Sequence, residues 1–285
     1  MNQQIKIHVF HTGKVCVAPE LPFGGEHCNP LKASGLFGKK SERLWLPVSA
    51  YFIECRQGKF LFDCGWHRNI SPKGIFDRKA QIKSLGNILL YKTNQGVLLF
   101  GEGIDEQLAK LGIKDTDLDF VLLSHLDCDH ANGLKLVAGA KKILVAEEEL
   151  KFATECSLTN RIRYNRNWWQ GTCLEGFAWN GTLGPAGKSY DLFGDNSFVM
   201  VNIPGHSKGL CALKITNPNG KYVLLFSDGG YAKKSWAEQI VSGIADDREA
   251  QKSSLAWIRQ QSLDSRCIES LANHDNDVQP HVIIL

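Results

Sequence analysis

The sequence predicts an α/β fold made of one domain. Apolar runs with the two-residue alternation of strands come first, and strands mixed with helical patterns follow. No internal repeat, low-complexity tract or linker rich in Pro, Gly and Ser marks a boundary, so we expect residues 1–285 to form a single domain. Histidines and aspartates stand directly after several apolar runs, and strand ends are where a sheet presents reactive side chains.

Strands are expected where apolar residues alternate with polar ones or form short runs between turn residues. Residues 46–65, LPVSAYFIECRQGKFLFDCG, are typical of a hairpin that turns between Arg56 and Lys59. The other expected elements are an opening strand at 5–10, a helix and then a buried strand within 105–127, a strand and a helix within 141–155, three strands within 197–230, a helix at 248–261 and a terminal strand within 269–285.

The composition is that of an ordinary globular protein. Hydrophobic residues make up 43% and charged residues 22%, and the formal net charge is +3. No block of five or six like charges occurs and no segment approaches 18 uninterrupted apolar residues. We therefore expect a small-molecule substrate, with neither nucleic acid nor a membrane as partner.

The nine cysteines are scattered singly and form no CxxC pair. This pattern argues against a zinc ribbon, a thioredoxin-like site and a disulfide framework, so most are expected to be buried free thiols. The start of the chain lacks a basic region followed by an apolar stretch, and we expect a cytoplasmic protein.

The most informative segment is LLSHLDCDHANGL, at 122–134. It places His125, Asp127, Asp129 and His130 within six positions, directly after a predicted buried strand. Without a cation, these carboxylates would repel one another. Imidazole and carboxylate ligands suit zinc, manganese or iron, so the segment predicts part of a divalent metal site.

One loop cannot surround an ion, so further ligands must come from elsewhere. The candidates are His206 in NIPGHSKG, Asp228 in FSDGG and His274 in NHDND. Asp63 also follows a strand, but we expect it to brace the metal loop by hydrogen bonds, as carboxylates behind metal ligands commonly do.

Together, HxxxDH, PGHSxG, SDxxY and a late His-Asp resemble the metallo-β-lactamase superfamily, and most of all its N-acyl homoserine lactonases. The resemblance runs from the hairpin at 46–65 to NHDND. Asp228 follows His206 by 22 residues and precedes His274 by 46, which is similar to those lactonases. Tyr231 falls where they keep a tyrosine that contacts the substrate.

The resemblance implies an αββα sandwich, two mixed β-sheets flanked by helices, with two divalent metal ions at one edge. By analogy, His125, Asp127 and His206 hold the first metal. Asp129, His130 and His274 hold the second, and Asp228 bridges both. The implied reaction is opening of a lactone, such as an N-acyl homoserine lactone in quorum quenching, by attack of a metal-bridging hydroxide.

Two residues receive catalytic roles from this resemblance. Tyr231 orients the carbonyl or supports the oxyanion, and Asp129 carries a proton to the departing alkoxide. The segment 152–179 is rich in aromatic and basic residues and is expected either to form an aromatic wall of the site or to be a packed helix and loop or a subunit contact. Residues 66–103 are candidates for substrate entry or for the contact of a homodimer.

Asp127 departs from the superfamily pattern HxHxDH, which has a histidine there. A carboxylate adds negative charge and a harder donor, so it favours iron or manganese over zinc, as the glutamate of flavodiiron relatives does. The alternative is that Asp127 does not coordinate and the first metal is weak or absent. Other open functions are hydrolysis of a thioester, phosphodiester or β-lactam, a diiron redox protein, and a non-catalytic metal-binding module.

Overall fold

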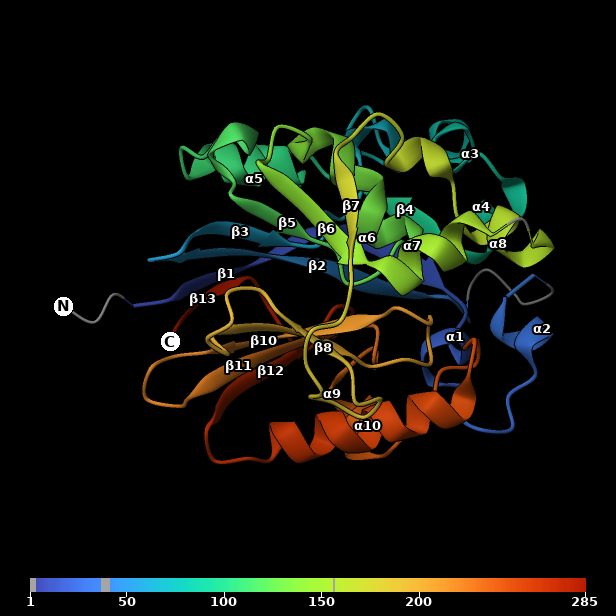
Figure 1. Cartoon of the computed structure of the whole chain (residues 1–285). Helices are drawn as coiled ribbons and strands as arrows, with labels where there is room; N and C mark the ends of the chain where they lie inside the picture. The colour runs from blue at the N-terminus through green and yellow to red at the C-terminus, as the bar shows by residue number, and fades with distance from the viewer. Residues whose placement is uncertain (1–3, 37–41, 156) are drawn as a thin grey trace.

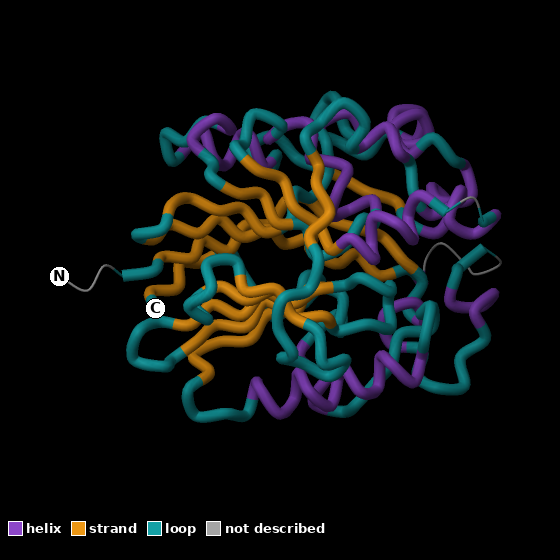
Figure 2. Tube along the Cα trace, in the orientation of Figure 1, coloured by secondary structure: helices purple, strands orange, loops and turns teal. Residues whose placement is uncertain are grey.

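Two β-sheets lie face to face in the computed structural model, with helices on both outer faces (Figure 1, Figure 2). The structure describes residues 4–36, 42–155 and 157–285. This is the αββα arrangement that the resemblance implied. None of the described helices has the length and apolar character needed to cross a membrane.

The first sheet has eight strands in the order β13-β1-β2-β3-β5-β6-β7, with β4 paired to β1. Its strands β3, β5, β6 and β7 run parallel, whereas β1 pairs antiparallel with β2, β4 and β13. The bounds are β1 Lys6–Val17, β2 Leu44–Cys55, β3 Gly58–Phe62, β4 Gln95–Val97, β5 Phe120–Leu122, β6 Lys142–Ala146, β7 Leu174–Phe177 and β13 His281–Ile284.

The second sheet has five strands in the order β12-β11-β10-β9-β8. The strands β11 and β12 are parallel, so their carboxyl ends lie at the same end of the sheet. The other pairs are antiparallel. The bounds are β8 Ser189–Asp191, β9 Phe198–Asn202, β10 Cys211–Thr216, β11 Tyr222–Ser227 and β12 Cys267–Ala272.

Most helices cover the first sheet, and α9 and α10 cover the second (Figure 1). The long helix α10 begins after Asp247, whose side chain accepts a hydrogen bond from Ala250 N, and it turns Leu255 and Ile258 towards the sheet. The bounds are α1 Glu20–Phe23, α2 Pro30–Ala33, α3 Arg78–Leu85, α4 Ile88–Thr93, α5 Ile104–Lys110, α6 Cys128–Ala131, α7 Glu147–Thr154, α8 Leu158–Arg163, α9 Lys233–Ala237, α10 Arg248–Ser262, and the 3-10 turns η2 Arg68–Ile70, η3 Asp115–Asp117, η4 Asn132–Val137 and η5 Arg166–Trp168.

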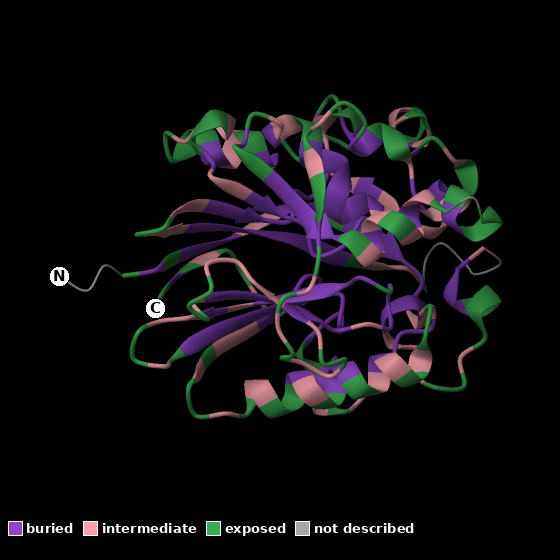
Figure 3. Ribbon diagram, viewed as in Figure 1, coloured by how far each residue is buried: buried purple, intermediate pink, exposed green. Residues whose placement is uncertain are grey.

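Strand alternation divides the core into layers. In β3, Phe60 and Phe62 belong to the cluster between the sheets, whereas Leu61 belongs to the cluster under the helices. The strands are accordingly buried on both faces, and the outer faces of the helices are exposed (Figure 3). This packing fixes the strand ends from which the candidate site residues project.

The hairpin, the buried strand before His125 and the three strands after 197 occur where the sequence predicted them. The strand β12 was not expected; it runs beside β11 and places His274 near Asp228. The eight cysteines within the described ranges are free, and Cys173 is exposed. Cys156 lies outside those ranges.

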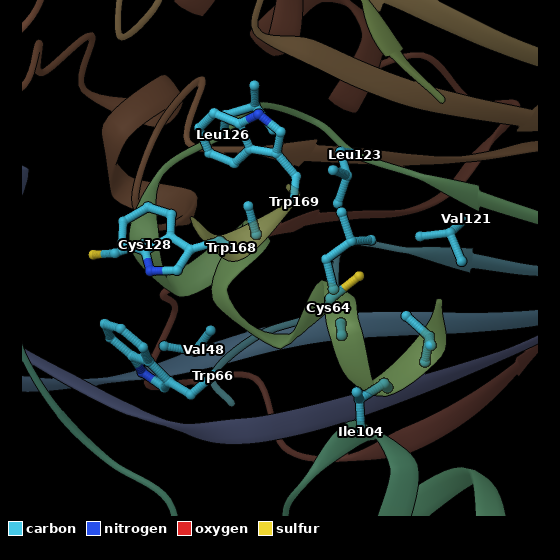
Figure 4. Packing of buried hydrophobic residues seen from close by; sticks show 14 of the residues in the cluster. Val48, Cys64, Trp66, Ile104, Val121, Leu123, Leu126, Cys128, Trp168 and Trp169 are labelled. Carbon is cyan, nitrogen blue, oxygen red and sulfur yellow. The ribbon is translucent and has the colours of Figure 1, made fainter. Parts of the chain in front are cut away.

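Of the two alternatives for 152–179, the described residues favour packing in the core over an aromatic wall of the site. Trp168, Trp169 and Tyr164 are buried in the core cluster beneath the helices, where the two tryptophans lie near Leu126 and Cys128 (Figure 4). Aromatic side chains of this size stabilise a core by burying large apolar areas. The part of this segment that reaches the candidate site is α8.

Candidate metal centre

The candidate site is built from loops that follow strands of both sheets. His125 comes after β5 and opens the loop that leads into α6. His206 follows β9, Asp228 follows β11 and His274 follows β12. Because these strands end at the same edge of the sandwich, their loops meet there.

All seven predicted ligands come together in this region. Three groups of candidate ligand atoms each lie within 4.8 Å of one another: His125 with Asp127 and His206, His125 with His130 and Asp228, and Asp129 with His130 and His274. The seven residues are His125, Asp127, Asp129, His130, His206, Asp228 and His274. We call His125, Asp127 and His206 the first ligand group, and Asp129, His130 and His274 the second; Asp228 lies between them.

The second ligand group has the spacing of a metal site. Nε2 of His274 lies 3.2 Å from Asp228 Oδ1 and 3.5 Å from Asp129 Oδ2, and Nε2 of His130 lies 3.4 Å from Asp228 Oδ1. Ligands bonded at about 2.1 Å to one tetrahedral ion are about 3.4 Å apart. The amide of Asn273 is a further neighbour, with Nδ2 3.3 Å from His130 Nε2.

Both histidines of the second ligand group are held in the tautomer that a metal requires. His130 Nδ1 lies 2.9 Å from Asp63 Oδ2, and His274 Nδ1 lies 2.7 Å from the carbonyl oxygen of Pro47. Both acceptors require a proton on Nδ1, so Nε2 keeps its lone pair for a ligand bond. The bracing role expected for Asp63 agrees with this geometry.

Asp63 is buried directly after β3, and both of its carboxylate oxygens also contact Ser124, which follows β5. Oδ1 accepts a hydrogen bond from Ser124 N at 2.8 Å, and Oδ2 accepts one from Ser124 Oγ at 2.8 Å. Ser124 Oγ is in turn 2.9 Å from His125 Nδ1. One carboxylate therefore positions the start of the loop that carries four candidate ligands.

The first ligand group is also compact. Asp127 Oδ2 lies 3.4 Å from His125 Nε2 and 2.9 Å from His206 Nε2. His206 Nε2 is 3.7 Å from Asp228 Oδ2. Burial and the neighbouring His130 lower the pKa of His125 to about 4, so this imidazole is neutral at pH 7.

Nothing in the sequence connected Arg163 with Asp127, yet they form a salt bridge. Arg163 Nε and Nη2 donate to Asp127 Oδ1 and Oδ2 at 2.5 Å and 2.8 Å. Burial alone would raise the pKa of Asp127, but the guanidinium of Arg163 and the contacts with His125 and His206 hold it well below its usual range. The carboxylate at this position is thus ionised and paired within the chain.

The other carboxylates of the site differ in their surroundings. Burial raises the pKa of Asp129, and the charges of Asp228 and Asp127 add to the effect against the opposing influence of nearby histidines. Burial opposes ionisation of Asp228 as well, but His274 and His130 hold its pKa well below the usual range. A divalent cation at this point would offset the repulsion among these carboxylates.

Glu149, on α7, is a second residue of the site that was not expected from the sequence. It is buried, and its Oε1 accepts from Leu126 N at 3.1 Å. Its Oε2 accepts from Ser207 Oγ at 2.7 Å and from Gly209 N at 3.1 Å. One carboxylate thereby joins the loop of His125 to the loop of His206. Nothing in the run AEEELKF marks the third glutamate as special.

A cavity of about 300 Å³ opens onto both ligand groups. Its polar end includes Tyr231, whose ring stacks on His274 with the centroids 5.2 Å apart. The rest of its wall is largely aliphatic and comes from β1, α1, α4, α8 and the loop before α10: Val15, Val17, Leu21, Leu90, Leu158, Ile162 and Ile244. The helices α4 and α8, which lie side by side (Figure 1), thus supply parts of the two segments expected near the substrate.

The chemistry of the site fits a bound divalent cation at the second ligand group. Asp228 Oδ1 is buried and has no hydrogen-bond partner among the described residues, and it lies within 3.4 Å of two histidine Nε2 atoms. A buried carboxylate oxygen without a partner is costly unless a ligand completes it. In the first ligand group, His125 Nε2 is likewise buried without a hydrogen bond to the described residues, but Asp127 is engaged by Arg163.

Comparisons with known proteins agree with this geometry. Residues 43–155 match the model of the metallo-beta-lactamase superfamily. The N-acyl homoserine lactonase AttM of Rhizobium radiobacter is 27% identical over 150 residues, which cover 50% of this chain and 53% of AttM. The match thus spans about half the length of that relative. The N-acyl homoserine lactonase AiiB of Agrobacterium fabrum is 25% identical over 249 residues, which cover 81% of this chain and 80% of AiiB.

A solved structure of an N-acyl homoserine lactone hydrolase has the same fold. That protein was solved with the product N-hexanoyl-L-homoserine bound at its catalytic metal centre. It superposes with a TM-score of 0.73 at 19% identity, over 97% of this chain and 95% of that chain. The chain therefore has the fold of the metallo-β-lactamase superfamily, within which it resembles the N-acyl homoserine lactonases.

Proposed function

We propose that the protein is a metal-dependent hydrolase that opens a lactone ring, with an N-acyl homoserine lactone as the substrate class. The observation that carries the proposal is the cavity. It joins the second ligand group and Tyr231 at one end to an aliphatic wall at the other, so a lactone ring and an acyl chain can be held together. The named activities of the relatives AttM and AiiB support the same substrate class.

Asp129, His130, His274 and Asp228 would hold a divalent cation, which would supply the Lewis acidity that activates water at neutral pH and polarises a carbonyl oxygen. This donor set of two imidazoles and two carboxylates suits zinc, iron or manganese. Asp63 and Glu149 keep the two ligand loops in place through the hydrogen bonds described above. At the first ligand group, both oxygens of Asp127 already accept hydrogen bonds from Arg163.

In the proposed reaction, water adds to the lactone carbonyl carbon and the ring C–O bond breaks, which gives an acyl homoserine with a free carboxylate and a hydroxyl group. Tyr231, on the wall of the cavity, donates its hydroxyl proton as a hydrogen bond to the carbonyl oxygen as negative charge develops there. Asp129 takes a proton from the attacking water and passes it to the departing alkoxide oxygen. The aliphatic wall excludes water from the acyl chain and positions the ring.

The geometry gives less support to the alternative functions. A phosphodiester needs free cationic donors, but the N–H groups of Arg163 point at Asp127, Asp246 and His206. Iron was favoured because Asp127 would add an oxygen ligand, and that oxygen is paired with Arg163. The diiron redox protein therefore loses the argument that suggested it.

A substrate panel tests the proposal. Purified protein loaded with Zn²⁺ or Mn²⁺ is assayed with N-hexanoyl homoserine lactone, an acyl thioester, a phosphodiester and a β-lactam. We expect the lactone to be opened with the highest kcat/KM. Tyr231→Phe should lower kcat for the lactone by about 100-fold and leave the metal content unchanged, because only a donor to the carbonyl oxygen is lost. Preference for another ester by the wild type would overturn the substrate assignment.

A further inference from the structure

Arg163 lies beside the first ligand group and contacts two of its candidate ligand atoms, Asp127 Oδ2 and His206 Nε2. Its side chain is only 17% exposed, and it meets Asp127 with two parallel N–H groups, Nε to Oδ1 at 2.5 Å and Nη2 to Oδ2 at 2.8 Å. This two-bond contact is the strongest geometry between an arginine and a carboxylate. Both oxygens of Asp127 therefore already accept charge-assisted hydrogen bonds.

The remaining N–H groups of Arg163 also have partners in the chain. Nη1 lies 3.2 Å from Asp246 Oδ2 and 3.2 Å from the carbonyl oxygen of His206. Nη2 lies 3.1 Å from Nε2 of His206. The guanidinium is thus held by two carboxylates and by both the main chain and the ring of His206, which makes it a fixed cation of the site.

These contacts compete directly with a metal ion. A cation in the first ligand group would bond to Asp127 Oδ2 and His206 Nε2, and these are the two atoms that Arg163 Nη2 contacts. With ligand bonds of about 2.1 Å, such an ion would lie within about 5 Å of the Nη2 nitrogen. A divalent cation and a guanidinium that share the same ligands at this distance repel each other strongly.

The second ligand group contrasts with the first in its supporting hydrogen bonds. Nδ1 of His130 and of His274 each faces an acceptor oxygen, as metal-binding histidines require. In the first group, Nδ1 of His125 lies 2.9 Å from Ser124 Oγ, but Nδ1 of His206 is buried and has no hydrogen-bond partner among the described residues. No Lys or Arg of the described ranges forms an ion pair with Asp129 or Asp228.

We propose that Arg163 takes the place of the first cation, so that the chain binds one divalent ion, at Asp129, His130, His274 and Asp228. Asp127 is then the partner of a built-in positive charge and not a metal ligand. Asp127, which stands where the HxHxDH pattern has a histidine, and Arg163 on α8 together take the place of a metal ligand and its metal ion. The proposal uses the same site as the proposed function but goes beyond it, because cation number is measured without any substrate.

Metal stoichiometry tests the proposal directly. The wild-type chain is stripped with a chelator, titrated with Co²⁺ while its visible absorbance is followed, and reloaded with Zn²⁺ for elemental analysis after gel filtration. We expect one equivalent of either ion per chain. Arg163→Met frees Asp127 and His206, and this variant should bind two equivalents. Arg161→Met, at an exposed arginine of the same helix, is the matched control and should bind one.

Two equivalents in the wild type would overturn the proposal, and this result needs no variant. One equivalent in a folded Arg163→Met protein, judged by its circular dichroism and melting temperature, would also overturn it, because the guanidinium would then not be what excludes the second ion. Lactone hydrolysis enters neither readout. A wild type with one ion and no lactonase activity would retain the proposal and refute the proposed substrate.

Discussion

Replacing Asp63 by Asn should weaken metal binding although Asp63 is not one of the candidate metal ligands. Asp63 has φ +61°, a backbone conformation that Asn also tolerates, so the variant should keep the turn after β3. Its amide can preserve the contact with Ser124 N through Oδ1. The NH₂ group then replaces Oδ2 and faces His130 Nδ1, 2.9 Å away in the native chain. Two donors cannot bond each other, so His130 must move its proton to Nε2, the atom expected to bind the metal.

The magnitude follows from the bond that is lost. A hydrogen bond to a charged group contributes about 1.5–3 kcal/mol, and a tenfold change in affinity corresponds to about 1.4 kcal/mol. We therefore expect the Kd for Zn²⁺ to rise by about 10- to 100-fold, which is also the usual effect of removing a partner of a metal-binding histidine. The exposed fraction of Asp63 is 0%, so water cannot replace the lost acceptor.

The assay is competition for Zn²⁺ against a chromophoric chelator, with circular dichroism to check the fold. Asp119→Asn is the matched control: Asp119 Oδ2 accepts from Lys59 N at 2.9 Å, and the residue stands just before β5, at the opposite end of that strand from His125. Its Kd should equal that of the wild type. A folded Asp63→Asn protein whose Kd stays within about twofold of the wild type would show that Asp63 does not set the tautomer of His130.

Three further predictions concern the ligand loops, the cavity and the buried thiols. Glu149→Gln replaces one of the two acceptor oxygens, each of which holds a different loop, by an NH₂ group, and should lower the unfolding free energy by about 2–4 kcal/mol in urea denaturation. An unchanged midpoint would mean that these hydrogen bonds do not stabilise the fold. Ile244→Trp fills the aliphatic part of the cavity and should raise the KM ratio of N-decanoyl to N-butanoyl homoserine lactone by about tenfold; equal KM changes for both would place the acyl chain elsewhere. Burial raises the pKa of the Cys64 and Cys211 thiols well above the ordinary value of 9.0. Above pH 9 these two thiols therefore stay protonated in the folded chain and lose their protons in the unfolded chain. Their contribution should make the unfolding free energy fall by up to about 3 kcal/mol per pH unit. Cys211→Ala should remove about half of that contribution in urea denaturation between pH 8 and 10.5, and an unaltered slope would contradict this origin.

Local patterns in the sequence predicted the strands that carry the site. The alternation in residues 46–65 and the apolar run before His125 are local signals, so the hairpin and β5 could be assigned from the sequence alone. The convergence of His206, Asp228 and His274 rested on the resemblance to a known family. Spacing alone does not say that β12 pairs parallel to β11, the contact that brings His274 to Asp228.

The partners of the site residues could not be predicted in the same way. Arg163 reaches Asp127 across 36 positions and Asp246 across 83, and no periodic pattern encodes such contacts. The aromatic residues around Arg163 suggested a wall of the substrate site, but Trp168 and Trp169 pack in the apolar core instead. The role of Arg163 became apparent only from the fold, which places its guanidinium beside Asp127.

The proposed function requires that a metal ion in this site opens a lactone. Conversion of N-hexanoyl homoserine lactone to N-hexanoyl homoserine is followed by liquid chromatography and mass spectrometry, with elemental analysis of the same protein samples. The protein is assayed as purified, after chelation, and after return of the metal. We expect ring opening that disappears with the chelator and returns with the ion. Ring opening that persists in protein shown to be free of metal, or none in protein that holds its ion, would contradict the proposed function.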